Sequence, residues 1–217
     1  MYEKIKKPSV KKYFDNVSVG KRTKQVVYFS QQHDKNAMFE QLTKESDSKQ
    51  TVVLVKSKKN ADSLSAYLKT KDIKAVSIHG NHRVAQIEDA AKAFNASELS
   101  VLITTDMILK SLELQNIQLI VNYDLPTQFE EYFVRLAYVD EVGESILLVN
   151  AEEESTLQII EMKMKMEIEQ GELEGFVDTQ LDPKNIQTKK DKKKKPRHRK
   201  KKKKIDPSKE EETTQSE

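Results

Sequence analysis

The sequence predicts an α/β fold in which a single parallel sheet is covered by helices on both faces. Short apolar runs rich in Val, Ile and Leu alternate five times with segments of helical periodicity. This alternation is typical of parallel strands joined by crossover helices. The runs also end in polar residues such as Asn122 and Asp124, and open α/β sheets bind their ligands at such strand ends.

The predicted elements follow one another along the chain. The expected strands are residues 25–30, 51–55, 74–78, 99–104, 117–122 and 145–150. The expected helices are residues 34–43, a segment that buries Ala61, Leu64 and Leu68, and residues 84–94, 106–110 and 129–136. Asp34 is a residue type able to cap the first of these helices. Each strand–helix–strand unit is expected to cross over with the right-handed sense.

The longest predicted helix spans residues 152–170 and has acidic residues in its first turn, where the helix dipole favours them. Its apolar stripe contains Leu157, Ile160, Met164 and Ile168, widened by Ile159, Met162 and Met166. A Met-rich stripe suits a partner groove or the domain core, and we expect the core. Gly171 and Gly175 are expected to stop the helix, and Phe176-Val177 to pack back onto the domain.

Charge divides the chain into an acidic body with basic ends. Residues 1–24 hold eight basic and two acidic residues, and residues 184–209 hold 13 Lys, 2 Arg and 2 Asp. With four Glu in the last eight residues, the formal charge of +3 leaves −12 for residues 25–183. We expect a basic leader or linker (1–24), a domain (25–150), a C-terminal helix and exit segment (151–183), and a disordered Lys-rich tail with an acidic end (184–217).

Composition also limits the compartment. The chain has no Cys, which fits a reducing environment and excludes disulfide or thiolate chemistry. No apolar run approaches the length of a membrane span, and the first residues lack the apolar core of a signal peptide. We therefore expect a cytoplasmic protein without a membrane partner.

The Lys-rich tail is the strongest functional signal that needs no analogy, and it predicts RNA binding. A dense cationic block neutralises phosphates and releases counterions. Because no aromatic residues are interleaved, base stacking and sequence preference are not expected. A solubilising tail and attraction to an anionic membrane are the alternatives. The tail residues that we expect to bind RNA are Lys192, Lys193, Lys194, Lys195, Arg197, Arg199, Lys200, Lys201, Lys202, Lys203 and Lys204.

Several ordered motifs between residues 25 and 176 resemble the second RecA-like lobe of a DEAD-box RNA helicase of bacterial type. Residues 54–62 are similar to motif IV, residues 78–81 to the His-Gly-Asp turn, and residues 104–106 to the start of motif V. Residues 121–126 match the strand that follows, and residues 130–135 the entrance to motif VI. The resemblance implies a RecA-like helicase C-terminal domain over residues 25–150, in a setting of RNA metabolism or ribosome assembly.

The same comparison shows departures from the family pattern that argue against catalysis. Where motif V has Ala-Ala-Arg-Gly-x-Asp, this chain has Ile108 to Glu113, and the arginines of motif VI become Tyr138 and Glu141. The third helix has Val84-x-x-Ile87 in place of Gln-x-x-Arg. Arginine fingers contribute on the order of 10³–10⁵ in rate. The sequence also has no Gly-x-x-x-x-Gly-Lys-Ser/Thr and no acidic motif for Mg²⁺, so ATP and Mg²⁺ are expected only if a first lobe is supplied by another chain.

The resemblance also suggests site residues, each with a structural alternative. We expect RNA phosphates to contact residues that follow three of the predicted strands: Lys56, Lys58, Lys59, His79, Gly80, Thr105 and Asp106. The alternatives are a solvated turn for the lysines, packing for His79 and a helix cap for Asp106. The resemblance makes Glu113 and Arg135 candidate remnants of the nucleotide side. Because Arg135 lacks its downstream partner arginines, we favour a structural ion pair for it, with Asp106 or Asp124. The His residues lack the acidic or Cys partners of a metal site, so no metal is expected.

Three functions are compatible with these patterns. The first is a non-catalytic RNA-binding protein, in which a degenerate helicase lobe is joined to a Lys-rich arm that supplies most of the affinity for structured or ribosomal RNA. The second is half of an ATP-dependent RNA helicase that a separate first lobe completes. The third is a protein-docking scaffold that competes with true helicases for partners.

Overall fold

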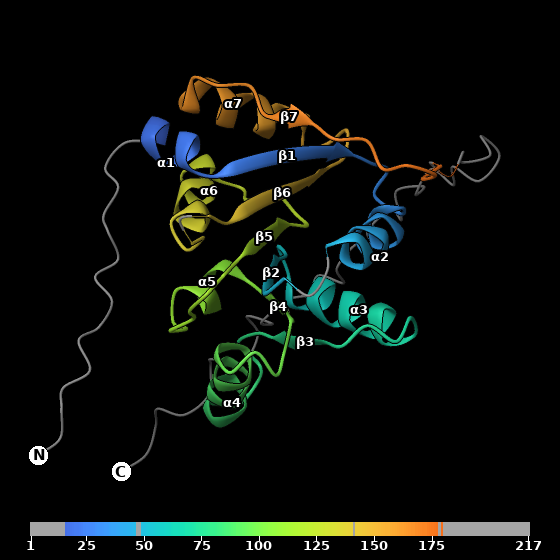
Figure 1. Ribbon diagram of the computed structural model, residues 1–217, viewed down its shortest axis with the longest axis vertical. Coiled ribbons are helices and arrows are strands. Elements are labelled where there is room, and N and C mark those ends of the chain that lie inside the picture. Colours follow the sequence, from blue (N-terminus) through green and yellow to red (C-terminus); the bar gives the residue numbers. More distant parts are fainter. Residues whose placement is uncertain (1–15, 47–48, 141, 178, 180–217) are drawn as a thin grey trace, which may run out of the picture. The chain divides into compact units, whose positions relative to one another are not determined.

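The fold is a parallel α/β sheet, as the sequence predicts. The computed structural model describes residues 16–46, 49–140, 142–177 and 179 (Figure 1). Seven strands follow the order β3-β4-β2-β5-β6-β1-β7, and every neighbouring pair is parallel. They are β1 (Lys24–Phe29), β2 (Thr51–Leu54), β3 (Ala75–Ile78), β4 (Val101–Thr104), β5 (Leu119–Asn122), β6 (Glu144–Val149) and β7 (Glu169–Gln170). The six predicted strands are all present, and β7 is an addition.

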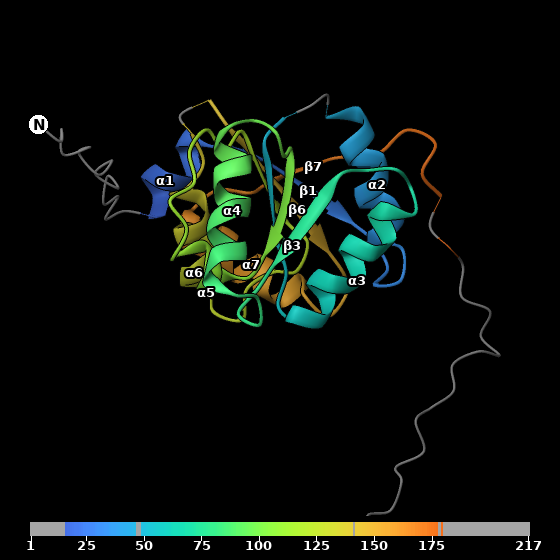
Figure 2. The same cartoon turned by 90° about the horizontal axis from the view of Figure 1, so that it is seen from below.

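Helices cover both faces of the sheet (Figure 2). They are α1 (Asn16–Arg22), α2 (Lys35–Glu45), α3 (Lys58–Lys69), α4 (Val84–Asn95), α5 (Asp106–Leu109), α6 (Phe129–Leu136) and α7 (Glu154–Met164). The buried clusters place α2 and α3 on one face and the other five helices on the opposite face. This is the RecA-like arrangement, and it gives the sheet one edge at which all carboxyl strand ends meet.

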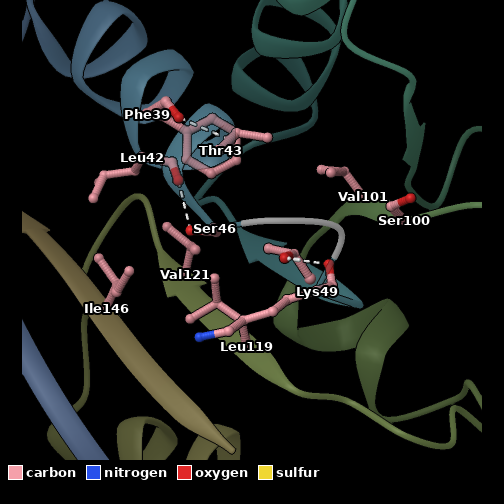
Figure 3. Close-up of a pocket in the computed structure, with 11 residues that line it drawn as sticks. Phe39, Leu42, Thr43, Ser46, Lys49, Ser100, Val101, Leu119, Val121 and Ile146 are labelled. Carbon is pink, nitrogen blue, oxygen red and sulfur yellow. Dashed lines mark hydrogen bonds between the residues drawn. The ribbon is translucent and has the colours of Figure 1, made fainter.

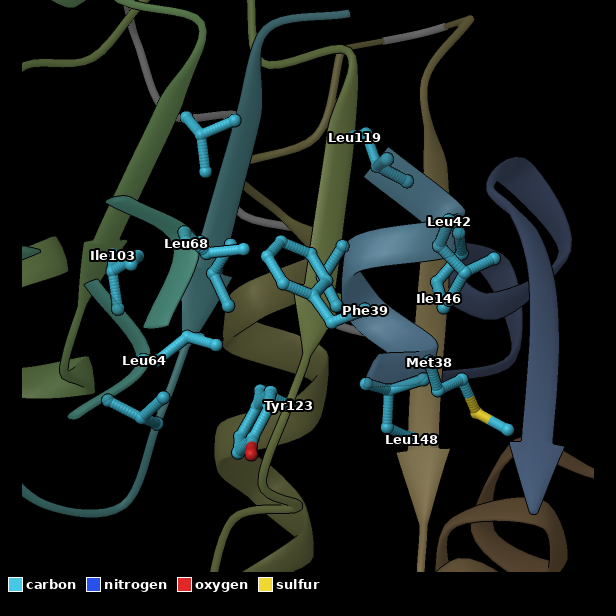
Figure 4. Packing of buried hydrophobic residues seen from close by; sticks show 14 of the residues in the cluster. Met38, Phe39, Leu42, Leu64, Leu68, Ile103, Leu119, Tyr123, Ile146 and Leu148 are labelled. Carbon is cyan, nitrogen blue, oxygen red and sulfur yellow. The ribbon is translucent and has the colours of Figure 1, made fainter. Parts of the chain in front are cut away.

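Alternate residues of each central strand point toward α2 and α3 and form the core beneath these two helices. Phe39 from α2 and Leu64 from α3 pack against Val53, Ile103 and Val121 of the central strands (Figure 4). The strands β2, β4 and β5 are buried on both faces, because helices cover each side. This explains why they read as continuous apolar runs in the sequence.

A small apolar cavity lies between α2 and the sheet, toward the amino ends of the strands (Figure 3). Its volume is about 40 Å³, and its walls include Phe39, Leu42, Val101 and Val121. The space holds one or two water molecules at most, and its lining is predominantly apolar. We interpret it as a packing gap.

The amino-terminal part of the chain differs from the prediction. Residues 16–22, expected to belong to a basic leader or linker, form the helix α1, and Val19 is 2% exposed against α6 and α7. Gly20 lies so close to Met164 that an added Cβ would sit 2.2 Å from the sulfur. Packing on α7, which is remote in the sequence, therefore orders a segment whose own composition gives little helical signal.

The helix predicted over residues 152–170 is shorter than expected. It ends at Met164 because Lys165 adopts a left-handed conformation with φ of +55°, which stops a helix without glycine. Gly171 and Gly175 therefore lie beyond the stop. The four residues of the predicted stripe are buried, although Ile168 lies outside the helix: Leu157, Ile160, Met164 and Ile168. Of the residues expected to widen the stripe, Met166 packs against this cluster, whereas Ile159 and Met162 are 40% and 65% exposed.

The exit segment after β7 crosses to the α2 face. Leu173 and Phe176 pack against the core beneath α2, as expected for Phe176, whereas Val177 is 83% exposed. Residues 1–15, Glu141 and the predicted tail over 184–217 lie outside the described residues. Within the described ranges, no helix is long and apolar enough to cross a membrane.

Candidate functional site

Four adjacent strands, β3, β4, β2 and β5, bring the predicted strand-end residues to one edge of the sheet. Lys56, Lys58 and Lys59 follow β2, His79-Gly80 follows β3, and Thr105-Asp106 follows β4. Because β4 lies between β2 and β3, these three turns are neighbours. We call Lys58, Lys59, Gly80 and Thr105 the strand-end surface.

Lys58 is the basic residue at the centre of the strand-end surface. Its Nζ donates a hydrogen bond to Asn81 Oδ1 at 2.6 Å and lies 3.6 Å from the position of a Cβ on Gly80. The Met107 side chain also reaches this position, at 3.7 Å. The turns after β2 and β3 and the start of α5 therefore meet around an exposed ammonium group, which is a suitable contact for a phosphate.

Backbone geometry keeps the Lys58 turn fixed. Ser57 caps α3 by accepting a hydrogen bond from the Asn60 N–H at 3.1 Å. Asp124, at the end of β5, accepts from the Lys56 N–H at 2.8 Å and from Asn60 Nδ2 at 2.9 Å. The basic turn is thus connected to a neighbouring strand end by two charge-assisted hydrogen bonds.

His79 packs inward, so its ring is not part of the exposed surface. The side chain is 5% exposed, and Nε2 lies 2.9 Å from Asp62 Oδ1. This hydrogen bond lowers the pKa of Asp62 below its ordinary value. The His82 ring lies 4.2 Å from the His79 ring, centroid to centroid. The His79 side chain therefore packs within the domain, which was the structural alternative to RNA contact.

Lys56 also turns away from the strand-end surface. Its Nζ lies 3.0 Å from Glu153 Oε1, while Lys35 Nζ lies 2.6 Å from Glu153 Oε2. Lys35 is fully buried and also donates to the Tyr123 carbonyl at 2.8 Å. Burial alone would raise the pKa of Glu153, but the two ammonium groups outweigh burial and lower that pKa. Sequence reasoning missed this cluster, because its members lie far apart in the chain.

Arg135 forms the ion pair with Asp106 that the sequence allowed as an alternative. Its Nε and NH2 donate to the two Asp106 oxygens at 2.7 and 2.8 Å. NH1 donates to Asn122 Oδ1 and to the Asp124 carbonyl, both at 2.9 Å. The Arg135 side chain is 1% exposed, so the guanidinium is held within the edge instead of facing a ligand.

The two residues considered as nucleotide-side remnants are not brought together. Glu113 is exposed, and its carbonyl accepts from Asn95 Nδ2 at 2.9 Å. Asn95 ends α4, which returns the chain to the amino end of β4. Glu113 therefore lies toward the opposite edge of the sheet from the Arg135 guanidinium.

Other predicted site residues fall outside this edge or outside the described residues. The tail residues Lys192 to Lys204 are not described. In the ranges that the structure describes, no group of three or more His, Cys, Asp or Glu side chains is arranged to hold a metal ion.

The fold and its edge define a RecA-like lobe, and comparisons with known proteins agree. Residues 34–137 match the model of the helicase conserved C-terminal domain. The chain is similar to ATP-dependent RNA helicase vasa of Drosophila melanogaster, with 32% identity over 121 residues, 55% of this chain and 18% of vasa. Eukaryotic initiation factor 4A of Dictyostelium discoideum is 29% identical over 133 residues, 61% of this chain and 30% of that protein.

Solved structures show the same fold. A DEAD box protein from Methanococcus jannaschii superposes with a TM-score of 0.66 at 24% identity, covering 71% of this chain and 43% of that one. E. coli SrmB, solved with regulator of ribonuclease activity A, gives 0.69 at 19%, covering 74% and 97%. Together these findings show that the chain is similar to the C-terminal lobe of DEAD-box RNA helicases. The chain spans about a third or less of the length of the curated relatives described here.

Proposed function

We propose that the protein binds RNA without catalysis, through the strand-end surface and the Lys-rich tail. The observation that carries this proposal is the meeting of Lys58, Gly80 and Thr105 at three adjacent strand ends. An ammonium group, a glycine backbone and a hydroxyl are groups that contact phosphate and sugar without reading bases. The similarity to RNA helicases supports the choice of RNA as the ligand.

The tail supplies the second half of the proposed interface. Residues 184–209 carry a net charge of +13, whereas the body is acidic and repels phosphate at long range. In this proposal the tail therefore supplies most of the affinity for RNA, and the lobe determines where the RNA is positioned. Structured or ribosomal RNA is the proposed ligand class, because the surface recognises backbone shape and not sequence.

The residues on the nucleotide side do not suit a triphosphate, which supports a non-catalytic role. Arg135 has its donors engaged by Asp106, Asn122 and Asp124. Lys110, where motif V of the family has arginine, lies 2.6 Å from Glu131. We propose that ATP and Mg²⁺ are not cofactors of this chain on its own, and we derive no reaction step through them.

Protein docking is a second candidate, supported by complexes of similar lobes. The SrmB lobe was solved bound to regulator of ribonuclease activity A, and a Dbp5 C-terminal domain was solved bound to Gle1. In this chain Met107, whose side chain reaches the position of a Cβ on Gly80, is 67% exposed, and Val84 at the start of α4 is 70% exposed. A docking scaffold predicts that a partner still binds when the tail is neutralised, while RNA binding is lost.

RNA binding across a salt series tests the proposal. We compare the native chain with a variant in which Lys192–Lys195 and Lys200–Lys204 are replaced by Gln. The slope of log affinity against log salt should become shallower by up to about six, since each single-strand phosphate contact contributes about 0.7. A native chain that fails to bind RNA at moderate salt would exclude the proposal and favour the docking scaffold.

The contribution of the lobe is tested separately by Lys58→Glu. Reversing one charge near a phosphate should weaken binding about tenfold. Lys92→Glu is the matched control, because Lys92 has the same charge, is 76% exposed and lies in the last turn of α4. Equal effects of the two variants would show that only net charge matters and that the strand-end surface has no specific role.

A further inference from the structure

Glu153 is the centre of a buried cluster to which the proposed function assigns no role. Its Oε2 accepts from Lys35 Nζ at 2.6 Å. Its Oε1 accepts from Lys56 Nζ at 3.0 Å and from the Leu125 N–H at 2.9 Å. The three partners follow β1, β2 and β5, and Glu153 follows β6, so the cluster joins four strands that are neighbours in the sheet (Figure 1). The cluster thus continues the carboxyl edge on which the strand-end surface lies.

The two ammonium groups of the cluster differ in how easily they can leave it. Lys35 is fully buried and also donates to the Tyr123 carbonyl at 2.8 Å, whereas the Lys56 side chain is 43% exposed. Burial alone would raise the pKa of Glu153, and the interactions with Lys35 do more to lower that pKa than those with Lys56. Lys56 can therefore depart and leave the buried carboxylate with its stronger partner, whereas the departure of Lys35 would strand a buried charge.

The backbone of Lys56 is held independently of its ammonium group. The Lys56 N–H donates to Asp124 Oδ2 at 2.8 Å. Ser57 is extended, with φ of −139° and ψ of 152°, and its side chain caps α3. An extended residue between Lys56 and Lys58 places their Cα atoms about 7 Å apart. Lys56 is thus rooted beside the strand-end surface, although its ammonium group points toward Glu153.

A phosphate can compete with Glu153 for Lys56. An ion pair whose cation is half exposed contributes little stability, so opening it costs little. A phosphate oxygen offers an ammonium group a charge-assisted hydrogen bond of the same kind. The exchange leaves Glu153 with Lys35 and the Leu125 N–H, and it adds a second ammonium group to the one that Lys58 presents.

We propose that Lys56 is a further RNA-contacting residue: its ammonium group leaves Glu153 when RNA binds and contacts a backbone phosphate beside Lys58. The inference rests on the proposed function, because it needs RNA at the strand-end surface, and it adds one phosphate contact to that surface. Glu153 then competes with RNA for Lys56 and lowers the affinity for RNA, while its pairing with Lys35 holds the edge of the sheet together.

The salt dependence of RNA binding tests the contact in the full chain, with a single-stranded oligo(U) as the probe. Lys56→Met removes the ammonium group and leaves Glu153 paired with Lys35. It should weaken binding by up to about fivefold and make the slope of log affinity against log salt shallower by about 0.7, which corresponds to one phosphate contact. Lys92→Met is the matched control, because it removes the same charge from a side chain of α4 that is 76% exposed. The control should keep the native slope, and a purely structural role of Lys56 predicts the native slope for Lys56→Met as well.

A charge-neutral double replacement, Lys35→Met with Glu153→Gln, tests the competition. It removes one cation and one anion, so the net charge is unchanged and no lone charge stays buried. The amide oxygen of the new glutamine can still accept from the Leu125 N–H. With Lys56 released, RNA binding should tighten by up to about fivefold. The same double replacement combined with Lys56→Met should leave the affinity of the Lys56→Met variant unchanged, because no ammonium group is released.

A native salt slope for Lys56→Met overturns the inference, as does a double replacement that folds and fails to tighten binding, or that tightens it equally without Lys56. If thermal unfolding shows that the double replacement does not fold, the salt slope of Lys56→Met decides alone. A native chain that binds no RNA refutes the proposed function, whereas a native chain that binds RNA with a slope unaffected by Lys56→Met refutes this inference only.

Discussion

Replacing Arg135 with leucine removes the charged centre of the carboxyl edge. The native guanidinium makes four hydrogen bonds of 2.7–2.9 Å, to Asp106, Asn122 and Asp124. Leucine fills part of the space, but it leaves the Asp106 carboxylate, which is 28% exposed, and the buried amide oxygen of Asn122 without the guanidinium donor. Removing one partner of a buried ion pair costs about 3–5 kcal/mol. We expect the free energy of unfolding to fall by about 4 kcal/mol.

Equilibrium unfolding in urea measures this change. With an m-value of about 2 kcal/mol/M, the midpoint should fall by about 2 M. Arg83→Leu is the control: Arg83 is exposed before α4, so its replacement should change the free energy by less than about 0.5 kcal/mol. Asp106→Leu combined with Arg135→Leu should cost less than the sum of the single changes, because no charge is left alone. A loss below about 1 kcal/mol for Arg135→Leu would refute the assignment of Arg135 to a structural ion pair.

Three further predictions concern stability. The hydrogen bond from Lys44, with those from Tyr67 and Lys71, lowers the pKa of Glu40 to about 2. The ionised Glu40 carboxylate therefore stabilises the fold above its unfolded pKa near 4.5, and this stabilisation is lost as the pH falls toward 2. Between pH 4.5 and 2 the urea midpoint of Glu40→Gln should therefore fall less steeply than that of the native chain. Val121→Ile should raise the free energy of unfolding by about 0.8 kcal/mol, because the added methylene fills the cavity beneath α2. Val52 does not line that cavity, so Val52→Ile should lower the free energy of unfolding by about 1–3 kcal/mol through overpacking. Thermal unfolding compares the two variants, and a gain in stability for both would contradict the assignment of the cavity. Gly143→Ala should lower the thermal midpoint, because an added Cβ would lie 2.3 Å from Val139 Cγ1 and 3.0 Å from the Gln118 carbonyl oxygen; an unchanged midpoint would show that Val139 moves freely.

The strands were predictable because burial on both faces leaves a direct trace in the sequence. Residues such as Val53 and Ile103 stand in short apolar runs bounded by polar turns, which identify the strands without knowledge of their partners. The Asp106–Arg135 pair was also among the alternatives, since it joins the starts of two motifs that parallel topology places at one edge. Local pattern and topology were sufficient for both.

Contacts between remote segments were not predictable from local pattern. Lys35 and Glu153 lie 118 residues apart, and neither residue type suggests full burial by itself. Lys165 ends α7 in a left-handed conformation, which lysine adopts rarely. Asp34 has the type and position of a helix cap but makes no side-chain capping hydrogen bond; its carboxylate instead accepts from Thr179 of the exit segment. In each case tertiary packing decides a choice that propensity leaves open.

The position of β1 in the sheet has a consequence for biosynthesis. This early strand lies between β6 and β7, and Lys24 is paired with Glu144, 120 residues later. At 5–20 residues per second, a ribosome needs about 6–24 s to cover that interval. Throughout it, an apolar strand emerges with neither of its hydrogen-bonding neighbours made. Non-local parallel pairing of this kind folds slowly and is prone to aggregation, so the nascent chain should depend on chaperone protection until β6 has emerged.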